Sequence, residues 1–214
     1  MRLVVQKERL RRVLLWAQLA LFAGAAGLVG YAGFAGADAW LFQQRESRQF
    51  ERLLAERHRA GFNSSWSGLV RTVPTSLTGQ PGASGILGRL EIQRLGLSAM
   101  VIEGDDPHTL RRAVGHIPGS ARPGENGNMV LTGHRDTFFR PLRRIRADDV
   151  ILLTTLQGQY RYRVRSTQVV RPDNVSVLEA GPKETLTLVT CHPFYFVGAA
   201  PNRFIVRAER LPGI

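Results

Sequence analysis

Hydrophobic patterning divides the chain into an uncharged N-terminal stretch and a longer region of alternating residues. Residues 13–37 contain no charged side chain over 25 positions. A helix needs roughly 20 apolar residues to cross the hydrocarbon core of a bilayer, so this stretch predicts a transmembrane helix. Ala-Gly-Ala at 35–37 is similar to a signal-peptide cleavage site, but a secretory signal has a shorter apolar region of about 7–15 residues. The length therefore favours a retained anchor over a cleaved signal.

The next segment lacks the composition of a folded core. Residues 38–62 mix apolar side chains with many charges, and Gly61 is a helix stop signal, which predicts a short amphipathic helix acting as a solvated stalk. Residues 63–85 are rich in Ser, Thr, Gly and Pro without periodicity, as is typical of a linker. We therefore expect a stalk and linker over 38–85 and a folded domain over 86–214.

Beyond this linker, short segments alternate apolar and polar residues with the period of β-strands. The predicted strands lie at 86–97, 98–104, 128–133, on either side of Gln157-Gly158, at 184–190 and at 203–211. Asp106 as a cap and Pro107 in the first turn predict one short helix between them. Seven or eight short strands with few helices predict an all-β domain, a closed or nearly closed β-barrel.

The charge balance narrows the choice of partners. The net charge is +12, from 29 basic and 17 acidic residues, and such a surplus is typical of proteins that bind nucleic acid, anionic membranes or acidic wall polymers. Five bases and one acid precede the apolar stretch, which leaves 24 and 16, or +8, beyond it. A basic flank stays on the cytoplasmic side. Residues 1–12 are therefore predicted to be cytoplasmic and the domain extracytoplasmic, which argues against nucleic acid.

The only cysteine, Cys191, lies at the end of a predicted strand that Pro193 terminates. Extracytoplasmic proteins usually carry cysteines in even numbers, and a single one cannot form an intrachain disulfide. The alternatives are a small apolar residue in the core, an intermolecular disulfide or a reactive thiol. A nucleophilic thiol needs a base and an oxyanion partner, because a free thiol is only a few per cent thiolate at neutral pH.

Two residues are candidates for these supporting roles. His134 ends another strand, and two strand ends at one rim of a barrel bring their side chains together. His192 adjoins Cys191, but neighbouring residues on a strand point to opposite faces. A hairpin between the last two strands places Arg203 near Cys191, where a guanidinium can donate two hydrogen bonds to an oxyanion. A structural role for each residue remains the alternative at this point.

Metal binding is not favoured. Cys191 with His134 and His192 lacks the paired spacings of zinc ligands. Three acidic residues lie in one loop: Glu103, Asp105 and Asp106. They show no evident calcium-ligand pattern, so we expect a solvated acidic turn.

Two motifs, LTGHRDTFF at 131–139 and TLVTC at 187–191, together with an arginine twelve residues after the cysteine, resemble the sortase family of cysteine transpeptidases. The resemblance covers roughly residues 86–210, includes GRLEIQRLGL and NRFIVRAERL, and is greatest for class D-type sortases. Two positions depart from the family pattern: many relatives have proline in place of Gln93, and an aromatic residue is common in place of His192.

The resemblance implies an eight-stranded sortase barrel and three roles. Cys191 would attack the carbonyl of an LPxTG-like sorting signal and form a thioacyl enzyme, with His134 as general acid and base. Arg203 would stabilise the carbonyl or oxyanion, and Thr190 is a weaker candidate for positioning the substrate, with strand packing as the alternative. An amine acceptor would then resolve the intermediate. No metal or organic cofactor is implied.

The expected protein is a single-pass plasma-membrane enzyme with an extracytoplasmic catalytic domain. Its expected partners are surface proteins with a C-terminal LPxTG-like signal and an amine of peptidoglycan or of another protein, not nucleic acid. Two alternatives stay open. One is a related thiol peptidase that only hydrolyses, and the other is a non-catalytic anchored barrel that binds anionic wall polymer.

Overall fold

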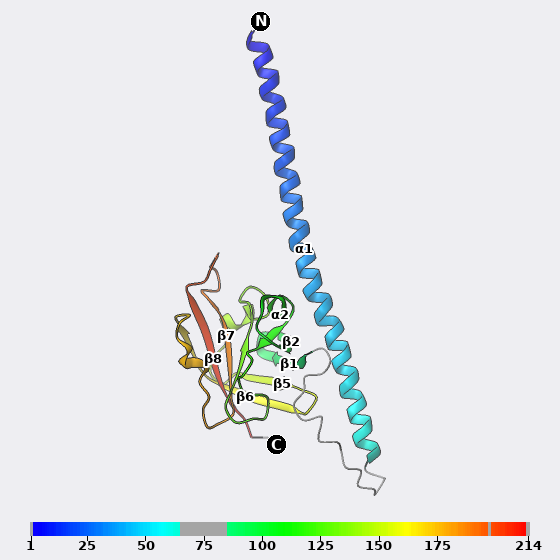
Figure 1. The fold of residues 1–214 in the computed structure, drawn as a ribbon, viewed down its shortest axis with the longest axis vertical. Helices are drawn as coiled ribbons and strands as arrows, with labels where there is room; N and C mark the ends of the chain where they lie inside the picture. The colour runs from blue at the N-terminus through cyan, green and yellow to red at the C-terminus, as the bar shows by residue number, and fades with distance from the viewer. Residues whose placement is uncertain (1, 65–84, 197, 213–214) are drawn as a thin grey trace. The chain divides into compact units, whose positions relative to one another are not determined.

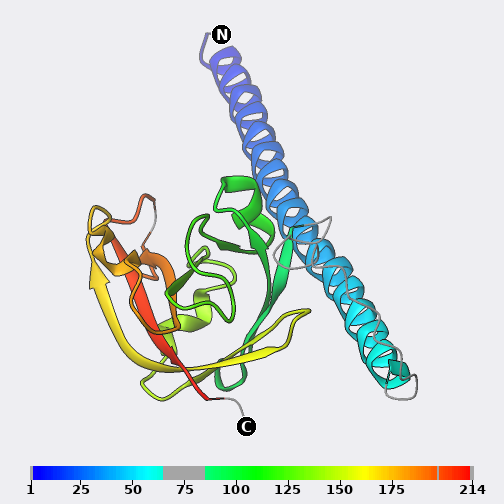
Figure 2. The same ribbon diagram turned by 60° about the horizontal axis from the view of Figure 1, so that its bottom comes forward.

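The computed structural model describes residues 2–64, 85–196 and 198–212, in which one long helix precedes a β-barrel (Figures 1 and 2). The chain divides into two compact units, Met1–Leu41 and Phe42–Ile214. The barrel lies wholly within the second unit.

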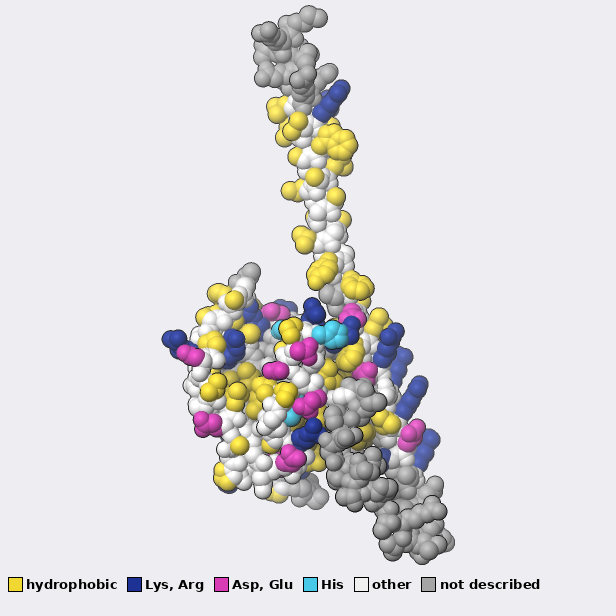
Figure 3. Space-filling model, viewed as in Figure 1, with side chains coloured by type: hydrophobic (Ala, Val, Ile, Leu, Met, Phe, Trp, Pro, Cys, Tyr) yellow, Lys and Arg dark blue, Asp and Glu magenta, His cyan; other side chains and the backbone are white. Residues whose placement is uncertain are grey.

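The helix α1 covers Arg2–Ser64 without interruption. The transmembrane helix and the amphipathic stalk, predicted as separate segments, are thus parts of a single helix. No proline precedes Pro74, so nothing removes a hydrogen bond from the helix interior. Among the described residues, one helical stretch, Leu10–Arg57, is long enough to cross a membrane, and its most apolar 18-residue window has a mean hydropathy of 1.9. Figure 3 shows hydrophobic side chains along the upper part of this helix.

Eight strands close into a barrel in the order β1-β2-β3-β4-β7-β8-β6-β5. They are β1 (Ile86–Ile92), β2 (Leu97–Glu103), β3 (Val114–His116), β4 (Asn128–Thr132), β5 (Val150–Thr154), β6 (Gln159–Val170), β7 (Thr185–His192) and β8 (Asn202–Arg210). β2 with β3 and β4 with β7 pair in parallel, and the other neighbours are antiparallel. The prediction of a closed eight-stranded barrel with short helices is confirmed.

Four short helices connect the strands: α2 (Pro107–Arg112), η2 (Gln93–Leu95), η3 (Arg140–Arg144) and η4 (Val175–Leu178). The Asp106 carboxylate accepts hydrogen bonds from the backbone N–H groups of His108 and Thr109, so the predicted cap of α2 is confirmed. The Thr109 hydroxyl also donates to this carboxylate, and these bonds lower the pKa of Asp106.

The alternation of residues along the strands builds the core as predicted. Inward-facing side chains of all eight strands are almost fully buried, among them Leu90, Val101, Val114, Leu131, Leu153, Val164, Leu188 and Val206. Burying one such side chain contributes about 1.5–3 kcal/mol. On β6, Tyr162 and Val164 are buried, whereas Arg161 and Arg165 are exposed. The arginine row of β6 therefore lies on the outer face of the barrel.

One buried carboxylate ties η2 to the loop that precedes β5. Asp149, which is 8% exposed, accepts hydrogen bonds from the Arg94 guanidinium on both carboxylate oxygens and from the Arg146 N–H at 2.8 Å. The hydrogen bonds from Arg94 outweigh the cost of burial and lower the pKa of Asp149. A carboxylate whose pKa is lowered by folding stabilises the folded state only where it is ionised.

We expect Asp149→Asn to lower the free energy of unfolding by about 1–2 kcal/mol near neutral pH, because charge-assisted hydrogen bonds are lost. The native contribution is present above the unfolded pKa of about 3.9 and is lost as the pH falls through the lower folded pKa. The deficit of the variant should therefore shrink below about pH 4. Near-UV circular dichroism during thermal unfolding, at neutral and acidic pH, measures this. A deficit that stays constant with pH would show that the charge is not its source.

Candidate active site

The cysteine and the arginine are direct partners across the last hairpin. Cys191 is the next-to-last residue of β7, and its register partner on β8 is Arg203, as the predicted hairpin requires. The thiol is free and half-buried. Because directly opposed residues lie on the same face of a sheet, the thiol and the guanidinium share one face. Arg203 Nη1 donates to the carbonyl oxygens of Ala200 at 3.3 Å and Asn202 at 3.1 Å, which holds the side chain at the start of β8.

Strand alternation places this pair on the outer face of the barrel. Leu186 and Leu188 belong to the core cluster, so Val189 and Cys191 alternate outward. β7 continues through His192, which therefore points away from the thiol. The His192 ring packs with Phe194 and Phe204, with ring centroids 6.0 Å and 6.1 Å apart. His192 is thus poorly placed to act as the base for Cys191.

His134 lies two residues beyond the end of β4. Thr132, the last residue of β4, pairs in parallel with Val189, so continuing the same register brings His134 level with Cys191. The Gly133 N–H still donates to the Val189 carbonyl at 3.2 Å, which extends the pairing past the end of the strand. His134 is exposed. The backbone thus brings the three predicted site residues to the ends of three neighbouring strands.

Thr190 takes part in this arrangement through the backbone. It is 2% exposed, and its hydroxyl donates to the Gly133 carbonyl at 2.7 Å. A Cβ atom on Gly133 would lie 3.0 Å from the Phe139 ring, so this position has little room for a side chain. Of the two roles considered for Thr190, packing between strands is the one these contacts favour.

The outer face of β4 and β7 is partly covered by η4. Val177 is 7% exposed, and its carbonyl accepts from Asn128 Nδ2 at 3.2 Å. Thr187, which is fully buried, donates to Asn128 Oδ1 at 2.7 Å. Between this covered part and Cys191 lie the half-buried side chains of Thr132 and Val189. We call these two residues the outer strip.

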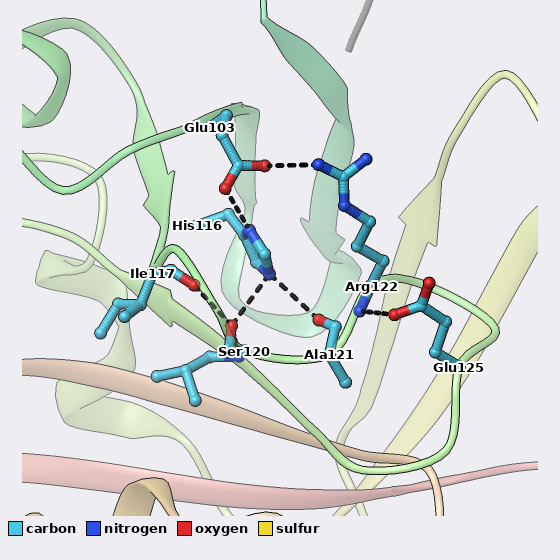
Figure 4. Close-up of polar contacts among 8 residues, drawn as sticks. Glu103, His116, Ile117, Ser120, Ala121, Arg122 and Glu125 are labelled. Carbon is cyan, nitrogen blue, oxygen red and sulfur yellow. Dashed lines mark hydrogen bonds and ion pairs between the residues drawn. The ribbon is translucent and has the colours of Figure 1, made fainter. Parts of the chain in front are cut away.

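Glu103, one of the three acidic residues considered for calcium, is engaged by other side chains (Figure 4). Glu103 Oε1 lies 3.1 Å from His116 Nδ1, and Glu103 Oε2 lies 3.6 Å from Arg122 Nη2. His116 is 1% exposed, and its Nε2 lies 3.0 Å from the Ala121 carbonyl and 2.9 Å from Ser120 Oγ. The sequence analysis predicted a solvated acidic turn, and for Glu103 this prediction is wrong. Glu103 belongs to a polar network that fixes the connection between β3 and β4.

The two neighbouring acids behave differently. Asp105 is exposed, and Asp106 is occupied in capping α2. Within residues 2–64, 85–196 and 198–212, the structure describes no group of three or more His, Cys, Asp or Glu side chains that could hold a metal.

Arg135 is the residue that sequence reasoning missed. It follows His134, is 6% exposed and donates hydrogen bonds to the β7–β8 connection. The signal for it in the sequence is its place next to His134 in Gly-His-Arg-Asp, a motif in which only the histidine was assigned a role.

Comparison with known proteins gives consistent matches. The sequence-family model of the sortase domain matches residues 90–211 of this chain. Sortase D of Bacillus subtilis (strain 168) is 35% identical over 195 residues, which cover 89% of this chain and 96% of that protein. Sortase A of Bacillus anthracis is 28% identical over 50% of this chain and 52% of its own.

Solved structures agree with these sequence matches. A Clostridium perfringens Sortase D5 transpeptidase superposes with a TM-score of 0.55 and 29% identity, covering 59% of this chain and 79% of that one. Sortase C-1 from Actinomyces oris gives a TM-score of 0.58 and 25% identity over 76% of this chain and 99% of that one. The two matches named D agree with the class that the motifs indicate.

Replacing Thr190 tests the link between β7 and the segment that carries His134. Thr190→Val keeps the shape but removes the donor to the buried Gly133 carbonyl, so we expect a loss of about 1–2 kcal/mol in the free energy of unfolding. Thr190→Ser, which keeps the hydroxyl, is the matched control. Thermal unfolding of the full chain in detergent compares them. Wild-type stability of the valine variant would show that the hydroxyl contributes nothing.

Proposed function

The chain belongs to the sortase family, and from this premise we propose that it is a membrane-anchored cysteine transpeptidase that acts on LPxTG-like sorting signals. One observation carries the proposal: a free thiol at a strand end is paired in register with Arg203, and His134 ends the neighbouring strand at the same level. A buried, inert cysteine would need none of these neighbours. The roles of the three residues follow from the chemistry of acyl transfer.

In the first half-reaction, the Cys191 thiolate attacks a backbone carbonyl of the sorting signal. A C–S bond forms, and the carbonyl oxygen becomes an oxyanion that the Arg203 guanidinium stabilises by charge and hydrogen bonds. The C–N bond then breaks as His134 donates a proton to the leaving amine. The product is a thioacyl enzyme that holds the N-terminal part of the signal.

In the second half-reaction, an amine of the cell envelope attacks the thioester. His134, now without its proton, accepts one from the amine as the new C–N bond forms, and the C–S bond breaks to return the thiolate. Imidazole suits both steps because it gains and loses protons near neutral pH. One amide is exchanged for another, so the reaction requires no external energy source and no cofactor.

The outer strip, Thr132 and Val189, supports binding of an extended peptide next to the thiol. Both side chains are half-buried, and both lie on the Cys191 face of parallel neighbours β4 and β7. Half-buried apolar and hydroxyl groups next to a nucleophile provide contact area without blocking access. A donor peptide lying along this strip would present its carbonyl to Cys191.

The proposed topology follows from the N-terminus. Arg2, Lys7, Arg9, Arg11 and Arg12 precede the apolar stretch, and positive flanks remain in the cytoplasm. The barrel would then be extracytoplasmic, at the plasma membrane. Its partners would be surface proteins with a C-terminal sorting signal and an amine acceptor from peptidoglycan or another protein.

Mass spectrometry of the full chain in detergent tests the proposal. With a panel of LPxTG-like peptides, we expect an acyl adduct on Cys191 and transfer of the acyl group to added glycine or diaminopimelate-type amines. Cys191→Ala should abolish the adduct. His134→Ala and Arg203→Ala should each slow transfer by at least about 100-fold, because general acid–base and oxyanion groups contribute that much. Circular dichroism checks that all three variants remain folded.

The outcomes separate the three candidate functions. An adduct that releases only free acid, even with excess amine, would indicate a peptidase that hydrolyses. Loss of folding in all three variants, with no adduct in the wild type, would indicate structural roles. The non-catalytic barrel that binds anionic wall polymer would then be favoured.

A further inference from the structure

Arg135 joins the segment that carries His134 to the connection that follows the nucleophile. Its Nη1 donates to the Pro193 carbonyl at 2.9 Å. Its Nη2 donates to the carbonyls of Phe196 at 2.6 Å and Gly198 at 3.1 Å. All three acceptors belong to residues 193–201, between β7 and β8. One side chain thus binds three backbone oxygens of a single connection.

This connection has little internal support. Among the backbone hydrogen bonds that the structure describes, the one within residues 193–201 joins the Phe196 N–H to the Pro193 carbonyl at 3.4 Å. The bonds from Arg135 are shorter and charge-assisted, which makes them stronger. The guanidinium also lies 5.9 Å from the centre of the Phe196 ring, in the range of a cation–π contact. Two other arginines bind single points of the connection: Arg143 donates to the Tyr195 hydroxyl at 2.7 Å, and Arg203 donates to the Ala200 carbonyl at 3.3 Å. Arg135 differs from both because it binds three carbonyls of the connection at once.

Both ends of the connection carry proposed catalytic residues. It begins two residues after Cys191 and ends two residues before Arg203. Arg135 itself follows His134, whose carbonyl accepts from the Phe139 N–H at 3.1 Å in a tight turn. A shift of the connection relative to this turn would change the spacing among the thiol, the imidazole and the guanidinium. Misplacement of reacting groups by about 1 Å can cost about 100-fold in rate.

An arginine suits this place and a lysine does not. The guanidinium is planar and always charged, and its donors diverge in fixed directions, so it can bind three carbonyls at once. A lysine ammonium is a compact point charge that would reach fewer of them. The nearest acid is exposed: Asp136 Oδ1 lies 3.5 Å from Nε, and its side chain is 70% exposed. The carbonyls are thus the main partners of this buried cation.

We propose that Arg135 is a positioning residue for transpeptidation, which holds the β7–β8 connection against the His134 turn and so fixes the spacing of the three catalytic groups. The inference rests on the function proposed above. Arg135 does not touch the reacting atoms, so it acts through Cys191, His134 and Arg203. Its loss should therefore lower kcat far more than it raises KM.

The test compares Arg135→Met, Arg135→Lys and the control Arg140→Met in the full chain in detergent. Arg140 is an exposed residue of η3, so its variant removes the same charge without changing the contacts of Arg135. Hydrogen exchange of the backbone amides in residues 194–203 measures the order of the connection, independently of activity. Steady-state transfer between peptide and amine gives kcat and KM.

We expect Arg135→Met to exchange at least about tenfold faster over 194–203, with β4 unchanged. Its kcat should fall about 10–100-fold, with KM within about threefold of the wild type. Arg135→Lys should lie between Arg135→Met and the wild type in both exchange rate and kcat. Arg140→Met should match the wild type in both measurements.

The proposal would be overturned if Arg135→Met showed the same hydrogen exchange and the same kcat as the wild type. Full activity of Arg135→Lys would also overturn it, because lysine lacks the planar guanidinium. If the methionine variant does not fold, the lysine variant decides by the same two readouts. Failure of the wild type to transfer any peptide would refute the proposed function instead. The exchange data would then still show whether Arg135 orders the connection.

Discussion

Parallel hydrogen bonding between β4 and β7 runs from Asn128 opposite Thr185 to Thr132 opposite Val189. It continues for one more residue through the Gly133 N–H and the Val189 carbonyl. A slip of one residue would turn every side chain of the strand to the other face, moving the core leucines of both strands into solvent. Because burial of each such side chain contributes about 1.5–3 kcal/mol, the core fixes the register. The register in turn sets His134 level with Cys191.

The second pairing, between β7 and β8, supplies the rest of the site. Cys191 opposite Arg203 is the last pair but one of that hairpin. The proposed nucleophile thus lies on a strand with both neighbours fixed, one in parallel and one antiparallel. In the proposed mechanism, the groups that activate the thiol and stabilise the oxyanion are therefore held at strand ends. The loops contact the site at the strand ends. There Thr190 of β7 donates to the Gly133 carbonyl, and Arg135 donates to the Pro193 carbonyl.

How far the sequence predicts this arrangement depends on the distance along the chain. The Asp106 cap and the β7–β8 hairpin are local, so alternation and cap residues were sufficient for both. The contact between β4 and β7 joins residues 57 apart in the sequence, and neither strand has a pattern that indicates which strand it pairs with. The motifs shared with sortases supplied that link. β3 was not predicted, because a segment of three residues is too short to show an alternation of apolar and polar side chains. It is a strand because it pairs with β2 and β4.

Arg135 was missed for a related reason. Its burial follows from the path of a connection almost 60 residues later, which alternation does not encode. The contact also clarifies the charge of the domain. Arg203 and Arg207 donate to backbone carbonyls instead of to acids, and Arg135 donates to three carbonyls beside its ion pair with the exposed Asp136. Carbonyls accept hydrogen bonds but carry no net charge, so such arginines organise loops and leave the positive surplus uncancelled. Part of the excess of +8 beyond the apolar stretch thus has a structural origin, and the charge alone gives no reason to assign the barrel a polyanionic ligand.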